Sequence, residues 1–124
     1  MIRPRLIVCT TCRAGLPLAE GETPQGAVLH AALSGLLAAT SAPPVDLHAA
    51  SCMANCEQGC SAAIAMPGKW TYVLGRLSPD LAEDLLRYAG VYAASATGTV
   101  MPSRRPASLA RAVVARVPHL EYAA

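Results

Sequence analysis

Residues 51–74 read SCMANCEQGCSAAIAMPGKWTYVL, a cysteine-rich loop followed by two short apolar segments. The two segments, residues 62–66 and 70–74, are separated only by Pro-Gly-Lys at 67–69. So short a connection containing proline and glycine is typical of a β-hairpin. We therefore expect two antiparallel strands immediately after the cysteine-rich loop.

Toward the N-terminus, the apolar, β-branched run Arg5–Cys9 is typical of a buried strand. The glycine- and proline-containing residues 10–22 are expected to form a loop. Thr23 and Pro24 match a helix start, and leucines then recur at helical spacing until about Thr40. A second strand is expected at Val45–His48. A strand, a helix and a second strand make a βαβ unit with parallel pairing.

Downstream of the hairpin, Ser78 and Pro79 repeat the helix-start signal, and apolar residues at helical spacing continue to about Ala94. The expected order is β-α-β-β-β-α, an α/β thioredoxin-like arrangement. We expect residues 1–100 to form this metal-cluster domain. Residues 101–124 should form a basic, proline-marked tail containing a short amphipathic helix.

The chain is nearly neutral, with a formal net charge of +2, but four arginines against one glutamate make residues 101–124 basic. Few lysines and aromatic rings argue against nucleic-acid binding. The basic tail is expected to contact an acidic protein partner or its own domain. No apolar run is long enough to cross a membrane, and the short apolar run after Arg5 does not fit a signal peptide. We therefore expect a cytoplasmic chain with reduced thiols.

The five cysteines fall into two groups, Cys9 and Cys12 (C-x2-C), then Cys52, Cys56 and Cys60 (C-x3-C-x3-C). Each group follows an expected strand of the βαβ unit, so both should meet at one edge of the sheet. A lone free cysteine is usually a small buried hydrophobic residue, but five at strand ends favour a shared role. The odd count and the expected cytoplasmic location argue against a disulfide framework.

Three chemistries fit these thiols. Zinc would be satisfied by four thiolates from Cys9, Cys12, Cys52 and Cys56. An iron–sulfur cluster also needs four thiolates, so spacing alone does not decide between them. Thiol–disulfide exchange at Cys9 and Cys12 is the third, although the expected helix begins well after Cys12, whereas a redox dithiol usually lies at a helix N-terminus. His48 is a further candidate ligand, although a lone histidine is more often only hydrogen-bonded or solvated.

The run from Cys52 to Tyr72 resembles the second half of thioredoxin-like [2Fe-2S] ferredoxins, and the resemblance extends over about residues 5–92. The whole chain, including Arg105-Pro106, is similar to an uncharacterised bacterial family of ferredoxin-like proteins, some associated with cobalamin biosynthesis. The resemblance implies a one-electron carrier rather than an enzyme, with a [2Fe-2S] cluster held by Cys9, Cys12, Cys52 and Cys56.

The resemblance also implies redox partners, a reductase and an acceptor enzyme, and a homodimer. It departs from the ferredoxins at two points. Cys9 and Cys12 are closer together than the first two ferredoxin cysteines, and the ferredoxins usually have no cysteine at the position of Cys60. Cys60 could replace a ligand, serve as a spare or be inert. A zinc-binding or metal-delivery protein using the same cysteines is the main alternative.

Overall fold

Strand β1 (Arg5–Cys9) pairs with a neighbouring strand on each side, as expected for a run whose Leu6 and Val8 are fully buried. It is parallel to β2 (Asp46–Ala50) and antiparallel to β3 (Ala62–Ala65). The computed structural model describes residues 3–13, 21–55 and 59–119. Within them the parallel βαβ unit predicted from the sequence is confirmed.

Strands β3 and β4 (Thr71–Leu74) form the predicted hairpin. The turn between them places Gly68 at a φ of +75°, a conformation that glycine adopts without steric cost. Strand β5 (Val113–Val117) pairs antiparallel with β4, so the sheet order is β2-β1-β3-β4-β5. The described part of the chain therefore forms one mixed five-stranded sheet.

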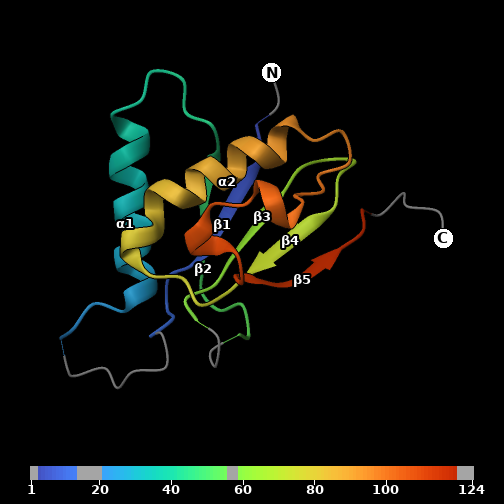
Figure 1. Cartoon of the computed structure of the whole chain (residues 1–124). Coiled ribbons are helices and arrows are strands. Elements are labelled where there is room, and N and C mark those ends of the chain that lie inside the picture. The colour runs from blue at the N-terminus through green and yellow to red at the C-terminus, as the bar shows by residue number, and fades with distance from the viewer. Residues whose placement is uncertain (1–2, 14–20, 56–58, 120–124) are drawn as a thin grey trace.

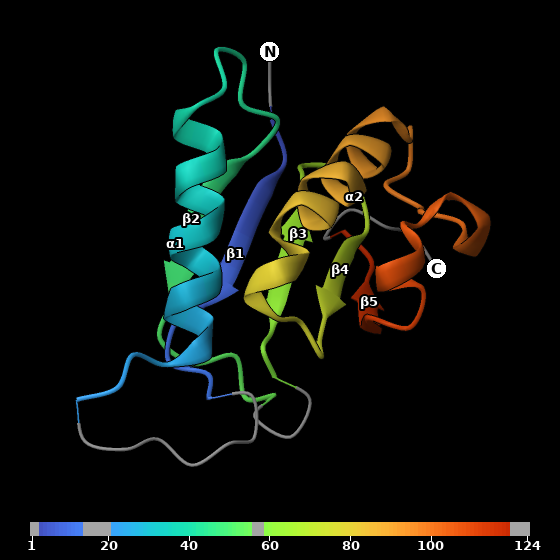
Figure 2. The same cartoon turned by 60° about the vertical axis from the view of Figure 1, so that its left-hand side comes forward.

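Two helices cover one side of the sheet and contact each other (Figures 1 and 2). Helix α1 (Gln25–Ala38) begins directly after Pro24, close to the expected start. Helix α2 (Ala82–Ala94) follows a short 3-10 turn, Pro79–Leu81, and ends at the expected residue. No helix of the described residues is long and apolar enough to cross a bilayer.

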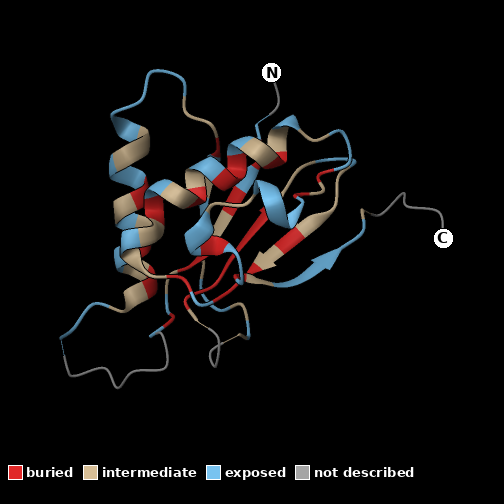
Figure 3. Cartoon of the chain, in the orientation of Figure 1, coloured by how far each residue is buried: buried red, intermediate tan, exposed pale blue. Residues whose placement is uncertain are grey.

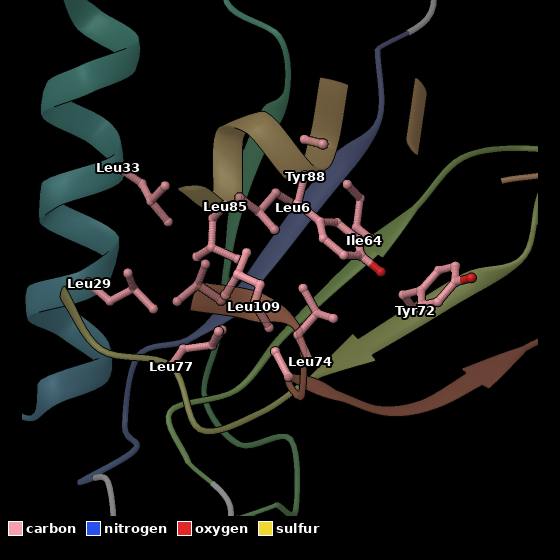
Figure 4. Close-up of a cluster of buried hydrophobic side chains, with 14 of the residues drawn as sticks. Leu6, Leu29, Leu33, Ile64, Tyr72, Leu74, Leu77, Leu85, Tyr88 and Leu109 are labelled. Atoms are coloured by element: carbon pink, nitrogen blue, oxygen red, sulfur yellow. The ribbon is translucent and has the colours of Figure 1, made fainter. Parts of the chain in front are cut away.

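The core lies between the helices and the sheet, where the buried sides of both helices face the strands (Figures 3 and 4). Leu29 and Leu33 of α1 and Leu85 of α2 lie in this layer and are at most 1% exposed. Tyr72 of β4 meets Tyr88 edge to face, with ring centroids 5.9 Å apart. Three such tyrosines supply much of the large side-chain volume in a chain that has no phenylalanine.

The prediction of an amphipathic helix in the tail is wrong. Two 3-10 turns, Pro102–Arg104 and Ala107–Leu109, are followed by β5, which extends the sheet at its β4 edge. Prolines at both ends limit helix length, and the β-branched valines of 113–117 favour extended backbone. The tail thus packs on its own domain, one of the two contacts expected for it.

Candidate metal centre

The C-x2-C motif continues the pairing of β1 with β2 beyond the ends of the strands. Cys9 is the last residue of β1, and Thr10 donates its backbone N–H to the Ala50 carbonyl oxygen at 2.9 Å. The Thr11 hydroxyl group donates to the carbonyl oxygen of Ser51. These contacts hold the first cysteine pair beside the start of the second cysteine loop. The two cysteine loops therefore begin side by side, as the parallel pairing predicted.

Helix α1 packs directly on the C-x2-C motif. Gly26 donates its backbone N–H to the Cys12 carbonyl oxygen at 2.9 Å. A Cβ added at Gly26 would overlap the carbonyl oxygen of Cys9 and lie 3.2 Å from the backbone nitrogen of Cys12. The helix therefore approaches the motif as closely as it does because residue 26 has no side chain.

Backbone hydrogen bonds hold Cys60 beside the end of β1. It precedes β3, and its backbone N–H and carbonyl oxygen both bond to Leu77, at 3.2 and 3.1 Å. The neighbouring Ser61 accepts the backbone N–H of Cys9 at 3.0 Å. Cys60 is thus locked between the end of β1 and the segment after β4.

The thiols of Cys9, Cys12 and Cys60 form one buried group, each at most 5% exposed. The Cys60 thiol lies close enough to those of Cys12 and Cys9 for both to oppose its ionisation. The pKa of the Cys60 thiol is raised to about 12, mainly by burial and further by the neighbouring Cys12 and Cys9 thiols. A cation bound to this group would offset the free-energy cost of ionising the buried thiols, because a metal binds cysteine as the thiolate.

The second loop presents its first cysteine to solvent. Cys52 is exposed, and its sulfur atom accepts the backbone N–H of Ala54 at 3.4 Å. The Asn55 side-chain amide donates to the buried hydroxyl group of Ser61 at 3.0 Å, which ties the loop to the start of β3. Cys56, the fourth predicted ligand, lies outside the described residues.

The remaining candidate ligand is His48 of β2. His48 is exposed in β2, where it is paired in register with Ile7. In residues 3–13, 21–55 and 59–119, no three histidine, cysteine or acidic side chains are arranged so that they would enclose an ion. The chemistry of the donor set nevertheless fits a thiolate-bound metal or cluster, since the Cys12 and Cys9 thiols are neighbours of Cys60 and Cys52 belongs to the adjoining loop.

Two features of this site were not predicted from the sequence. One is the contact between α1 and the C-x2-C motif: the helix begins well after Cys12 along the chain, yet its first turn touches Cys12 in space. The other is the position of Cys60, whose role was left open and whose thiol lies with those of Cys9 and Cys12. The sequence did contain a signal for this position, because Cys60 comes just before a strand that pairs with β1.

Known structures resemble the chain in fold. A thioredoxin-like [2Fe-2S] ferredoxin from Aquifex aeolicus matches with a TM-score of 0.58 at 15% identity, covering 97% of this chain and 98% of that one. A variant of such a ferredoxin from Aquifex aeolicus, with one cysteine changed to serine, matches with a TM-score of 0.53 at 13% identity. That match covers 90% of this chain and 98% of the other. The α/β thioredoxin-like ferredoxin fold predicted from the sequence is confirmed.

At these identities the similarity establishes the fold alone. No curated protein matches the chain significantly. None of these comparisons shows a link to cobalamin biosynthesis. The model of a family described as a protein of unknown function, DUF1636, matches residues 6–119. The match spans nearly the whole described fold, and the chain therefore belongs to the DUF1636 family.

Proposed function

We propose that this protein is a one-electron carrier whose cysteine thiolates hold a [2Fe-2S] cluster. The observation that carries the proposal is the buried group of Cys9, Cys12 and Cys60 thiols at one end of the sheet. The fold it shares with a ferredoxin supports the same conclusion. When bound, the cluster would supply reversible one-electron transfer.

The chain's own residues would supply the ligands and their surroundings. We infer that Cys9, Cys12 and Cys60 are three of the four ligands and that the second loop provides the fourth, Cys52 or Cys56. This differs from the set that the resemblance implies by including Cys60. The Ala54 N–H directed at the Cys52 sulfur is the kind of hydrogen bond that tunes a cluster potential. The exposed position of Cys52 leaves one side of the site open to a partner.

From the resemblance we propose two partners, a reductase that donates the electron and an enzyme that accepts it. On the same basis we propose that the acceptor enzyme acts in cobalamin biosynthesis. The resemblance also implies a homodimer. Light scattering on the purified protein tests this, since a mass of one 12.8 kDa chain would contradict it.

One observation favours a second candidate, thiol–disulfide exchange. The Cys12 and Cys60 thiols are neighbours, and Cys12 lies beside the first turn of α1, the position that a redox dithiol usually takes. The pair would be Cys12 with Cys60 rather than Cys9 with Cys12. Zinc bound by the same thiols is the third candidate.

The deciding experiment is the visible absorption spectrum of protein purified without oxygen, with iron, acid-labile sulfide and zinc measured on the same sample. Red-brown protein with about two irons and two sulfides per chain is expected. Colourless protein with zinc and no sulfide would support the zinc site. Metal-free protein with two rapidly exchanging thiols would support the dithiol.

Single cysteine-to-serine variants then identify the ligands. We expect Cys9→Ser, Cys12→Ser and Cys60→Ser each to lower iron content and change the spectrum. Only one of Cys52→Ser and Cys56→Ser should do the same, and the other serves as the matched control. Full iron in Cys60→Ser together with loss in both loop variants would contradict our set and support the one implied by the resemblance.

A further inference from the structure

A second site lies at the β4–β5 edge of the sheet, two strands away from β1 and its cysteine. The segment that follows α2 runs beside β4 and β5 (Figures 1 and 2). Residues of this segment and of the two strands line an open cavity of about 360 Å³. Ligand pockets in proteins have volumes of roughly 300–1,000 Å³. The cavity is therefore large enough for a small organic molecule.

The cavity has an apolar wall and a set of hydrogen-bond donors. Met101, Pro102 and Val113 contribute apolar surface. Arg105 and Arg116 also line it, and no carboxylate does. The ion pairs within the described residues join Arg3 to Asp46 and Arg87 to Asp84, so no described carboxylate neutralises either cavity arginine.

Both arginines are held in place by contacts that leave N–H groups available. The Arg105 side chain donates from Nε to the Val100 carbonyl oxygen at 3.3 Å and from Nη1 to that of Ala110 at 3.4 Å. These two bonds use two of the five N–H groups of a guanidinium. The Arg116 guanidinium carbon lies over the Trp70 ring, 4.2 Å from its centroid, a cation–π contact that does not use the N–H groups as hydrogen-bond donors.

Tyr72 adds a buried donor to the same cavity. It is 2% exposed, and its hydroxyl oxygen accepts the backbone N–H of Val100 at 3.0 Å. Within the described part of the chain, the hydroxyl group donates no hydrogen bond. Figure 4 shows this hydroxyl group on the side of the ring away from the core leucines. The polar lining thus offers hydrogens and positive charge, the complement of anionic oxygen atoms.

We propose that this cavity binds a small organic anion, a carboxylate or phosphate ester carried on a compact apolar group. Arg105 and Arg116 bind the anionic oxygens, and Met101, Pro102 and Val113 contact the apolar group. The site is separate from the cysteines and does not depend on which metal they hold.

The test is a titration of the full chain, as purified, followed by amide chemical shifts. Phenyl phosphate and benzoate are the two anionic probes, and they distinguish the two headgroups. Inorganic phosphate and benzyl alcohol are controls that carry only the charge or only the apolar ring. We expect at least one anionic probe to shift the amides of Val100, Met101 and Ala115 and to bind at least tenfold more tightly than either control.

Charge variants show whether the two cavity arginines are responsible. Arg116→Gln and Arg105→Gln should each weaken probe binding at least tenfold. Arg111→Gln, which removes an exposed charge of the same segment outside the cavity, should change it less than twofold. Arg116→Gln keeps the proposal testable if loss of the Arg105 hydrogen bonds unfolds the segment. Absence of binding, equal binding of a control probe, or equal weakening by Arg111→Gln would overturn the proposal.

Discussion

Gly26 is the residue at which helix α1 meets the thiol site, and it allows a sharp test of that contact. We expect Gly26→Ala to destabilise the protein by about 2 kcal/mol or more, because the added methyl group must displace the backbone of Cys9. The measurement is urea unfolding, together with the iron content, which should also fall.

Gly35 provides the matched control on the same helix. Nothing lies within 4 Å of a Cβ added there, so Gly35→Ala should stabilise the protein by about 0.5–1 kcal/mol through helix propensity. Equal effects of the two substitutions would show that α1 does not pack on the C-x2-C motif as described.

Two tyrosines of α2 differ in one hydrogen bond. The Tyr92 hydroxyl group donates to the Trp70 carbonyl oxygen at 2.6 Å, whereas the buried Tyr88 hydroxyl group has no partner within the described residues. We expect Tyr92→Phe to lower the free energy of unfolding by about 1 kcal/mol. Tyr88→Phe should leave it unchanged or raise it by about 1 kcal/mol, since it removes an unsatisfied buried group. A larger loss for Tyr88→Phe in urea unfolding would contradict this assignment.

Strand β5 is the element that the sequence did not reveal, and its removal tests its contribution. It is largely exposed, but it covers the edge of β4 through four registered residue pairs (Figure 3). A chain ending after Ala110 should lose about 2 kcal/mol or more of unfolding free energy, because the ladder hydrogen bonds and the Gly75–Ala112 bond disappear.

A chain ending after His119 keeps β5 and is the control for this truncation. Its urea midpoint should stay close to that of the full chain. If both truncated chains unfold at the same midpoint, β5 does not stabilise the sheet. Anionic probes should also fail to bind the shorter chain, because β5 forms one wall of the cavity.

The stability of the whole molecule should fall in alkaline solution. Burial raises the pKa of Tyr92 to about 12, from an ordinary value of 10, and raises the pKa of Tyr88 still further. The folded state then holds protons that the unfolded state releases, so the contribution of these two tyrosines to stability is fully present below pH 10 and decreases as the pH rises toward 12. Urea unfolding between pH 9 and 11 measures this slope, and Tyr88→Phe and Tyr92→Phe should each reduce it. An unchanged slope in both variants would assign the alkaline loss to other groups.

Local patterns were sufficient for most of the fold. Three short segments each favour one local conformation: the run Arg5–Cys9, the Pro-Gly turn after β3 and the Ser78-Pro79 signal near α2. Such preferences do not depend on distant contacts, so the β-α-β-β-β-α order and the meeting of the cysteine groups could be predicted. The tail was predicted wrongly because valines with helical spacing also suit an edge strand, and pairing with β4 decides between the two.

The sequence by itself determined the order of the elements, the positions of the cysteines at strand ends and the family resemblance. Only the tertiary structure decided that Cys60 joins Cys9 and Cys12, that Gly26 presses against them, and that Arg105 and Arg116 share a cavity. The physical reason is that these contacts join residues far apart in the chain. Their distances follow from strand register and helix packing, which no short segment of sequence specifies.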